Sequence, residues 1–301
     1  MALLLNDDDV KDLLTPQLAM RAVRGVIAGF ARGDVVAPAR VTADLGAGQM
    51  TYTTGATAEV YGYRSYDSLA PGKVDQVVTC LDRATRRLKY VHAGSLVGIA
   101  RTGAIGGVAV DALAAADATS LALIGTGIQA YWQAWAIAAT RPLTDVRVYS
   151  PTADHRVAFA RRLVDRLGLP ARSVDHPRDA VDGAQIVVLA TTAHEPVVEA
   201  GWIADAAHLS SLGAKVPGAA EYDEALLEES FVSTDSLAQL EALTGSTQGV
   251  EHLGHHLDPG PDRLRGRRLT FFQSCGLGGT EVALLDALGA AVVAQSPSAQ
   301  A

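Results

Sequence analysis

The sequence has little cysteine, no excess of positive charge and no long apolar run at its start. Cys80 and Cys275 are its only cysteines, so a disulfide framework is excluded and a reducing compartment, the cytoplasm, is expected. Its 25 Lys and Arg against 33 Asp and Glu give a formal net charge of −8, which argues against nucleic acid or an anionic membrane as a partner. The stretch Met1–Asn6 lacks the basic residues and the apolar length of a signal peptide or a membrane anchor, so we expect neither.

What the sequence does contain is a glycine-rich turn between a strand-like and a helix-like segment. The apolar run Leu121–Ile124 predicts a buried parallel strand, and Gly125-Thr126-Gly127-Ile128-Gln129-Ala130 then opens a helical pattern that ends near Ala139. Gly125 would permit the tight turn, Gly127 would let the backbone approach a pyrophosphate, and Ala130 would keep the helix close to the strand. The segment therefore predicts a dinucleotide site, and the alternative is a turn that only punctuates the fold.

The chain divides into two regions of different periodicity. Short β-prone runs separated by glycine turns between residues 39 and 92 predict an antiparallel sheet, and Thr15-Pro16 predicts the start of a preceding helix. From residue 121 onward strand-like and helix-like runs alternate, which predicts a doubly wound parallel sheet with its ligand at the carboxyl ends of the strands. The expected strands are Met50–Thr54, Val60–Tyr66, Val74–Leu81, Leu88–Val91, Leu121–Ile124, Val146–Tyr149, Ile186–Ala190, His208–Leu212 and Phe231–Ser233.

We therefore predict an α/β protein with a Rossmann-type doubly wound sheet and a second, α+β domain. Residues 1–116 with 274–301 would form the substrate-binding and dimerisation domain, and residues 117–273 the dinucleotide-binding domain. A helix over about Ser95–Ala116 would join the two, and the tail Gln295–Ala301 is expected to be disordered.

The choice of nicotinamide cofactor depends on the end of the second strand of the parallel sheet. An acid there commonly holds the ribose hydroxyls of NAD, whereas this chain has Ser150 and Thr152, with Arg156 slightly further on. A small polar loop next to a cation suits a 2′-phosphate, so NADP(H) is favoured over NAD(H). The alternative is that Arg156 is an ordinary solvated helix residue.

Several ordered motifs together resemble the ornithine cyclodeaminase and mu-crystallin family. They span most of the chain: Pro38-Ala39-Arg40, Arg101-Thr102-Gly103-Ala104, Gly125 to Ala130, Leu212 to Gly218 with Glu221, and Ser274-Cys275-Gly276. The resemblance implies a homodimer and reversible hydride transfer at a carbon that bears nitrogen. It also implies that Arg40 and Arg101 hold the α-carboxylate of a small substrate, since guanidinium groups bind carboxylates bidentately. The alternative for both arginines is an ion pair.

Two positions depart from the family pattern. Members usually carry a lysine after a glycine in the third strand of the first domain, but Gly62-Tyr63-Arg64 places Arg64 there. Arginine keeps the charge for carboxylate binding and is a poor proton donor, because its pKa exceeds about 12. Arg64 is therefore a candidate substrate ligand and a weaker candidate for catalysis, and the alternative is an exposed strand residue.

The second departure is Lys215, in the turn where cyclodeaminases have an aspartate that faces an amine. Two ammonium groups about 4 Å apart repel by about 4 kcal/mol at an effective dielectric of 20, so cyclisation of ornithine is disfavoured. Lys215 would suit a second carboxylate, a carbonyl oxygen or proton transfer. The alternatives are that it points to solvent or pairs with Glu221.

Other polar residues are weaker candidates. His252, His255 and His256 are interpreted as a linker and not as a metal site, so no metal is expected. His208 and Cys275 are interpreted as buried structural residues, and Glu281 as a cap or interdomain contact. The predicted cofactor contacts are Thr102, Gly125, Thr126, Gly127, Ile128, Gln129, Ser150, Thr152, Arg156, Thr191 and Gly276.

The sequence leaves three hypotheses for function. The leading one is an NAD(P)-dependent oxidoreductase that acts on the C–N bond of a small carboxylate-bearing substrate, either reducing an imine or oxidising an amino acid. The second is a cyclodeaminase, a lyase with an internal redox cycle. The third, which the resemblance to mu-crystallin allows, is a non-catalytic NADPH-dependent binding protein.

Overall fold

The computed structural model describes residues 2–69, 75–258 and 262–295, and the chain forms two compact units. The first unit comprises residues 1–104 and 277–301, and the second comprises residues 105–276. The sequence pattern placed these divisions at 116/117 and 273/274. The first division falls earlier because the second half of the helix Leu96–Leu113 packs into the core of the second unit, where Val110 and Ala114 contact the cluster around Leu121.

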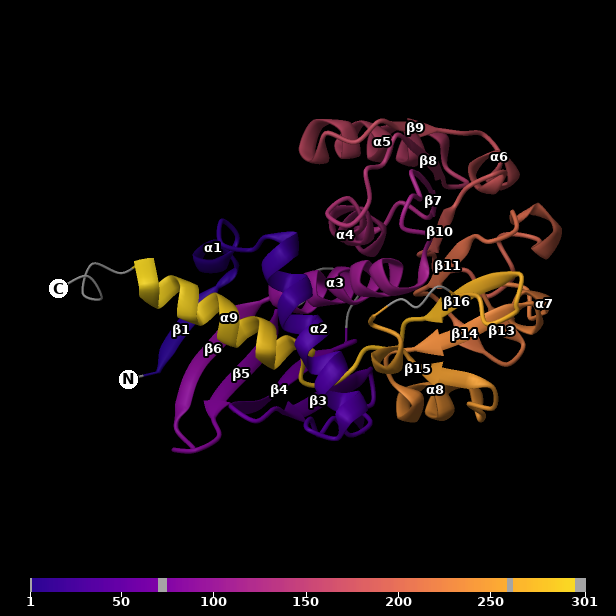
Figure 1. The fold of residues 1–301 in the computed structure, drawn as a ribbon. Helices are drawn as coiled ribbons and strands as arrows, with labels where there is room; N and C mark the ends of the chain where they lie inside the picture. The colour runs from indigo at the N-terminus through magenta and orange to yellow at the C-terminus, as the bar shows by residue number, and fades with distance from the viewer. Residues whose placement is uncertain (1, 70–74, 259–261, 296–301) are drawn as a thin grey trace. The chain divides into compact units, whose positions relative to one another are not determined.

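The first unit is built on a six-stranded sheet in the order β1-β6-β5-β4-β3-β2 (Figure 1). The strands β2 to β6 pair antiparallel, as predicted for residues 39–92, and Leu3–Asn6 adds a strand that was not predicted and is parallel to β6. Its strands are β1 Leu3–Asn6, β2 Val41–Asp44, β3 Gln49–Ala56, β4 Val60–Asp67, β5 Gln76–Asp82 and β6 Leu88–Gly94. The predicted beginning of β5 at Val74 and the tail from 296 lie outside the described residues.

One face of this sheet is covered by helices. α9, Thr280–Gln295, packs against β4, β5 and β6 and against α2, Pro16–Arg32 (Figure 1). The predicted start of α2 is confirmed, because the Thr15 side chain accepts a hydrogen bond from Leu18 N and Pro16 occupies the first turn. The remaining helices of this unit are α1 Asp7–Val10 and the first part of α3 Leu96–Leu113.

The other face of the sheet exposes apolar side chains. Val41, Tyr52 and Val77 are 64%, 41% and 37% exposed. The pairs Val41↔Tyr52, Tyr52↔Ser65 and Ser65↔Val77 place them in one row across four strands. The two faces differ because successive side chains of a strand point to opposite sides. Thr53 and Val78, the chain neighbours of Tyr52 and Val77, point to the helix-covered side and are buried.

The second unit is built on an eight-stranded sheet whose strand pairs are all parallel in the described part of the chain, as the alternation of strands and helices predicted. Its order is β15-β14-β16-β11-β10-β7-β8-β9, with a separate two-stranded hairpin, β12-β13. The strands are β7 Ser120–Ile124, β8 Asp145–Tyr149, β9 Ala171–Ser173, β10 Ile186–Leu189, β11 His208–Ser211, β12 Lys215–Val216, β13 Ala219–Ala220, β14 Ser230–Thr234, β15 Val250–His252 and β16 Leu269–Gln273.

Helices connect these strands and enclose two apolar clusters. One cluster gathers Leu121, Leu123, Ala130 and Val146 with neighbours from α4 and α5. The other gathers Val187, Leu209 and Phe271 on the opposite face of the sheet. The helices are α4 Ile128–Ile137, α5 Ala153–Leu167, α6 Pro177–Val181, α7 Ala225–Glu228 and α8 Leu237–Thr244, with short 3-10 turns η1 Ala200–Trp202 and η2 Leu253–His255.

The helix α3 is long and apolar enough to cross a membrane by composition alone. Its most apolar window is 78% buried inside the protein, which is typical of a core helix.

Candidate cofactor and substrate sites

The glycine turn follows β7 and meets the end of β10. Gly125 has φ +110, in the region that favours glycine, and a Cβ at this position would lie 2.2 Å from the Ala190 carbonyl oxygen. Its amide donates to the Tyr149 carbonyl at the end of β8. Gly125 is therefore required by the fold itself, because the turn must pass between two neighbouring strands.

Gly127 lacks a side chain for a different reason. Its φ is −77, and a Cβ built there meets no heavy atom within 4 Å among the described residues. It is the N-cap of α4, with no side chain capping the helix, so the first amides of α4 are left for another partner. An uncapped helix N-terminus with open space in front of it fits the pyrophosphate of a dinucleotide.

A pocket with a volume of about 440 Å³ opens beside this turn. It contains the predicted contacts Gly125, Thr126, Gly127, Ser150, Thr152 and Thr191, together with Ile124, Tyr149, Pro151, His155, Ala190, Thr192, Ala193 and Val197. Its lining in the described chain does not include the other predicted contacts, Thr102, Ile128, Gln129, Arg156 and Gly276. Thr102 belongs to the first unit, where its hydroxyl donates to the Gly98 carbonyl. The sequence reasoning did not single out His155, whose place after the second strand was the available signal.

The end of β8 carries the residues predicted to select the cofactor. Ser150 is buried and its carbonyl accepts a hydrogen bond of 3.2 Å from Arg156 Nη1, which places the guanidinium next to the pocket loop. Arg156 also forms an ion pair with Asp175, whose side chain is 93% exposed. Arg156 is therefore held at the strand end and is not simply a solvated helix residue.

A buried carboxylate that sequence reasoning left without a role holds two loops at the edge of this pocket. Glu221 is fully buried, and its Oε2 accepts hydrogen bonds from Thr191 N and Oγ1 at 2.9 and 2.7 Å. Its Oε1 accepts from Ser211 Oγ, Leu212 N and Gly213 N at 2.8, 3.1 and 2.6 Å. Glu221 thus fixes the loop after β10 to the loop after β11.

Asp235 plays the same part for the loop after β16. Its carboxylate accepts hydrogen bonds from the amides of Cys275 and Gly276 at 2.7 and 2.8 Å, and its side chain is buried. Nothing in the local sequence marked Asp235, because its partners lie 40 and 41 residues away.

In the first unit, Arg64, Arg101 and Glu281 form a buried cluster that we call the arginine–glutamate cluster. Arg64 Nη1 and Arg101 Nη2 lie 3.3 and 3.0 Å from the same oxygen, Glu281 Oε1. The side chains of Arg64 and Arg101 are 9% and 8% exposed. The alternative, that Arg64 is an exposed strand residue, is wrong, because β4 turns its side chain to the helix-covered face of the sheet, where it is buried.

The charges in this cluster shift one another's titration. Burial raises the pKa of Glu281, but the positive charges of Arg101 and Arg64 outweigh burial and hold the pKa below its ordinary value. Burial and the charge of Arg101 lower the pKa of Arg64. Two cations and one anion leave a net positive charge in a buried place, which favours binding of a carboxylate.

Arg40, the third predicted carboxylate ligand, lies half-buried directly before β2. Its neighbour Val41 pairs with Tyr52, the residue next to Thr53, and Thr53 Oγ1 contacts Glu281 Oε1 at 3.4 Å. The structure thus brings Arg64 and Arg101 together. It places Arg40 directly before β2, the strand that pairs with β3, where Thr53 lies.

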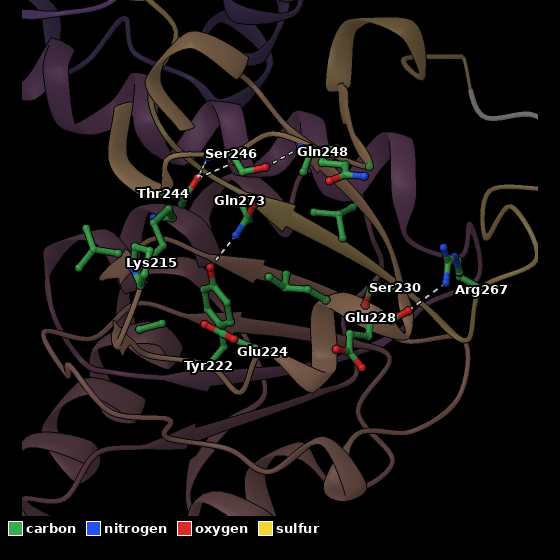
Figure 2. Close-up of a pocket in the computed structure, with 17 residues that line it drawn as sticks. Lys215, Tyr222, Glu224, Glu228, Ser230, Thr244, Ser246, Gln248, Arg267 and Gln273 are labelled. Atoms are coloured by element: carbon green, nitrogen blue, oxygen red, sulfur yellow. Dashed lines mark hydrogen bonds between the residues drawn. The ribbon is translucent and has the colours of Figure 1, made fainter. Parts of the chain in front are cut away.

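Lys215 lines a second pocket of the second unit, with a volume of about 410 Å³ (Figure 2). It is only 6% exposed, so the expectation of a solvent-pointing lysine is wrong, and its Nζ donates to the Gly213 carbonyl at 2.7 Å. The wall of the pocket includes Tyr222, whose hydroxyl accepts a 2.5 Å hydrogen bond from Gln273 Nε2. Burial raises the pKa of Tyr222 to about 12, so Tyr222 is neutral at physiological pH.

The residues interpreted as structural behave in that way. His208 is fully buried between Thr270 Oγ1 and Ser210 Oγ, and burial lowers its pKa to about 3. Cys275 is a buried thiol that takes part in no disulfide. Among the described residues, no group of three or more His, Cys, Asp or Glu side chains is placed to hold a metal ion.

The parallel sheet and its glycine turn define a Rossmann-like fold joined to a mixed-sheet unit. Residues 3–288 match the ornithine cyclodeaminase/mu-crystallin family, and the chain belongs to that family.

The chain is also similar to individual amino-acid dehydrogenases and to an imine reductase. The chain is 26% identical over 304 residues to the alanine dehydrogenase of Archaeoglobus fulgidus, covering 94% of this chain and 92% of that protein. It is 27% identical over 309 residues to the NAD(P)H-dependent anabolic L-arginine dehydrogenase of Pseudomonas aeruginosa, covering 95% and 96%. The structure of Thermococcus litoralis Δ1-pyrroline-2-carboxylate reductase with NADH and L-proline superposes with a TM-score of 0.81 at 25% identity, covering 96% of this chain and 95% of that one.

Proposed function

We propose that the protein is an NAD(P)-dependent oxidoreductase that acts on the C–N bond of a small carboxylate-bearing substrate. In the reductive direction an imine, NAD(P)H and a proton give an amine and NAD(P)+, and amino-acid oxidation is the reverse. The observation that carries the proposal is the buried pair Arg64 and Arg101, which share one carboxylate and keep a net positive charge. The named dehydrogenases and reductase among the relatives act on compounds of this class.

The cofactor would be held by the glycine-turn pocket. The open N-terminus of α4 at Gly127 would bind the pyrophosphate, and Ser150 and Thr152 would lie along the adenosine ribose. When bound, the nicotinamide supplies or accepts a hydride. The protein's own contribution is to orient the substrate: Arg101, Arg64 and Arg40 would bind the α-carboxylate and fix the neighbouring carbon.

Lys215 would act on a polar group of a ligand bound in its own pocket of the second unit. A buried ammonium in a polar pocket suits a second carboxylate or a carbonyl oxygen, or donates a proton where negative charge develops. The same charge disfavours a substrate with a distal amine, so cyclisation of ornithine is the less favoured activity. A non-catalytic NADPH-binding role is the remaining alternative.

We further propose a preference for NADP(H). Ser150, and not an acid, directly follows β8. Arg156 lies at the strand end, where its partner Asp175 is exposed enough to move aside for a 2′-phosphate. Ser150→Asp should shift the preference towards NADH, because its carboxylate would accept the ribose hydroxyls and repel the phosphate. Fluorescence titrations of NADPH and NADH test this, and a wild type that strongly prefers NADH would refute it.

The activity is tested with purified protein, NADPH and a panel of cyclic imines and of 2-oxo acids with amines. Arg101→Ala should raise KM and lower kcat/KM by about 100-fold while cofactor affinity is unchanged, a loss of about 3 kcal/mol. The matched control is Arg87→Ala, which removes an exposed arginine of the same unit. Efficient conversion of ornithine to proline by the wild type would favour the lyase, and tight NADPH binding without turnover of any compound would favour the binding protein.

A further inference from the structure

The arginine–glutamate cluster has an architecture that carboxylate binding by arginine does not by itself explain. Glu281 Oε1 interacts with side chains from three other elements. It accepts a hydrogen bond from Thr53 on β3 and pairs with Arg64 on β4 and Arg101 on α3. Its other oxygen, Oε2, accepts from Thr280 Oγ1 at 3.2 Å. Glu281 itself is 1% exposed. One buried carboxylate therefore sets the positions of two guanidinium groups.

Glycines bring Glu281 to this position. A Cβ on Gly55 would lie 2.5 Å from Gly279 Cα, and one on Gly278 would lie 2.2 Å from the Thr54 carbonyl oxygen. The start of α9 can therefore press directly on β3, which places Glu281 beside Thr53. Local backbone contact, and not flexible side chains, fixes the carboxylate.

Arg64 is held from a second side as well. Its Nε donates to Gln76 Oε1 at 2.8 Å, and its guanidinium stacks 4.1 Å from the centre of the Tyr66 ring. A Cβ on Gly98 would lie 2.9 Å from Arg64 Nε, so α3 leaves just enough room for this side chain.

Arg101 keeps unused binding capacity. Arg101 is only 7% exposed, and its buried Nε finds no hydrogen-bond partner among the described residues. A buried donor without a partner costs free energy of the order of 1–3 kcal/mol, unless a ligand accepts from it. The cluster thus offers an unfilled donor in addition to its net positive charge.

We propose that Glu281 is the positioning residue of the substrate-carboxylate site: its charge holds Arg64 and Arg101 together at the spacing that an incoming carboxylate needs. Without that charge the two buried guanidinium groups repel each other. The proposal rests on the proposed function for the identity of the ligand, and it extends that function to a residue on α9 that does not itself contact the substrate.

The test compares Glu281→Gln and Glu281→Asp with the wild type, in the full chain with NADPH. Glu281→Gln should raise KM for the best carboxylate substrate of the panel by about 10- to 100-fold, with kcat changed less than about threefold and cofactor affinity unchanged. Glu281→Asp keeps the charge and should recover most of the loss. The matched control is Asp286→Asn on the same helix, a carboxylate paired with Lys89 at 2.5 Å.

A second experiment measures the chemical accessibility of the two arginines in the absence of substrate. The rate at which 4-hydroxyphenylglyoxal modifies Arg64 and Arg101, followed by peptide mass spectrometry, should rise at least about fivefold in Glu281→Gln and not in Asp286→Asn. Unchanged modification rates, or an unchanged KM in Glu281→Gln, would overturn the role of Glu281. If instead no carboxylate is turned over or bound by the wild type, the proposed function fails, while the modification rates still decide the positioning role.

Discussion

At the scale of single residues, the two glycines of the turn after β7 differ in what they do. Gly125 is required by its positive φ and by the Ala190 carbonyl, whereas Gly127 has ordinary φ and empty space around its missing Cβ. A substitution at Gly127 should therefore leave the fold intact and affect only what binds there. This contrast separates a glycine that the fold requires from one that the fold does not require, within three positions of the chain.

We predict that Gly127→Asp abolishes dinucleotide binding without loss of stability. The carboxylate would occupy the place expected for the pyrophosphate and repel it, so the affinity for NADPH should fall by about 100-fold or more, equivalent to about 2.8 kcal/mol. Gly201→Asp is the matched control, since a Cβ there also meets no heavy atom within 4 Å. Fluorescence titration measures the affinity, and an unchanged dissociation constant in Gly127→Asp would contradict the assignment.

At the scale of secondary-structure elements, buried acids connect loops that follow different strands. Glu221 ties the loop after β10 to the loop after β11, and Asp235 ties the end of β14 to the loop after β16. The carboxyl ends of parallel strands meet at one edge of the sheet, so these acids order the edge where a ligand of this fold binds.

Glu221→Gln tests this coupling. The amide would turn an N–H towards groups that are themselves donors, so we expect a fall of several degrees in Tm and about tenfold weaker NADPH binding through displacement of Thr191. The control is Glu199→Gln, which changes an exposed glutamate directly before η1. Calorimetry measures the Tm and fluorescence titration measures the affinity for NADPH. A variant that matches the wild type in both would show that Glu221 does not couple these loops to the cofactor site.

At the scale of the whole molecule, buried histidines make stability depend on pH. Burial lowers the pKa of His208 from its ordinary value of 6.5 to about 3. Between these values the unfolded chain binds the proton and the folded chain does not, so folding stability is full above pH 6.5 and falls as the pH drops. Burial also lowers the pKa of His92, His252 and His256, which adds to the same trend.

We therefore expect acid destabilisation well above the titration range of carboxylates. His208 alone should cost about 1.4 kcal/mol per pH unit, or about 2 kcal/mol between pH 6.5 and pH 5. Urea unfolding at both pH values measures it, and His208→Gln should reduce the slope. Equal stability at pH 5 and pH 7 would show that His208 is accessible or charged in the folded protein.

The exposed apolar row of Val41, Tyr52 and Val77 leads to a prediction about assembly. Such a row on a sheet face is typical of an interface, and we propose that it pairs with a second copy of the chain. Tyr52→Asp with Val77→Asp should convert a dimer into a monomer in light scattering, with Thr85→Asp in the exposed β5–β6 turn as control. A monomeric wild type, or a double variant that stays dimeric, would refute the interface.

The sequence by itself determined those features that depend on local pattern. The strand, turn and helix around Gly125–Ala130 and the start of α2 at Thr15 follow from short-range periodicity and capping, and both are present in the structure. It did not predict β16, although Leu269–Gln273 lies between β14 and β11, since a short apolar run near turn residues does not distinguish a buried strand from a loop.

Only the tertiary structure decided how the site residues are grouped. Glu281 meets Arg64 across 217 positions of the chain. Glu221 and Asp235 accept hydrogen bonds from amides of the segments 212–218 and 274–276, and these pairings cannot be read from the motifs themselves. The sequence supplied Arg64 and Arg101 as charged candidates, but their shared carboxylate depends on α9 pressing on β3 at Gly55 and Gly279. Long-range packing of this kind has no period in the sequence, because it follows from the shapes of elements that meet only after folding.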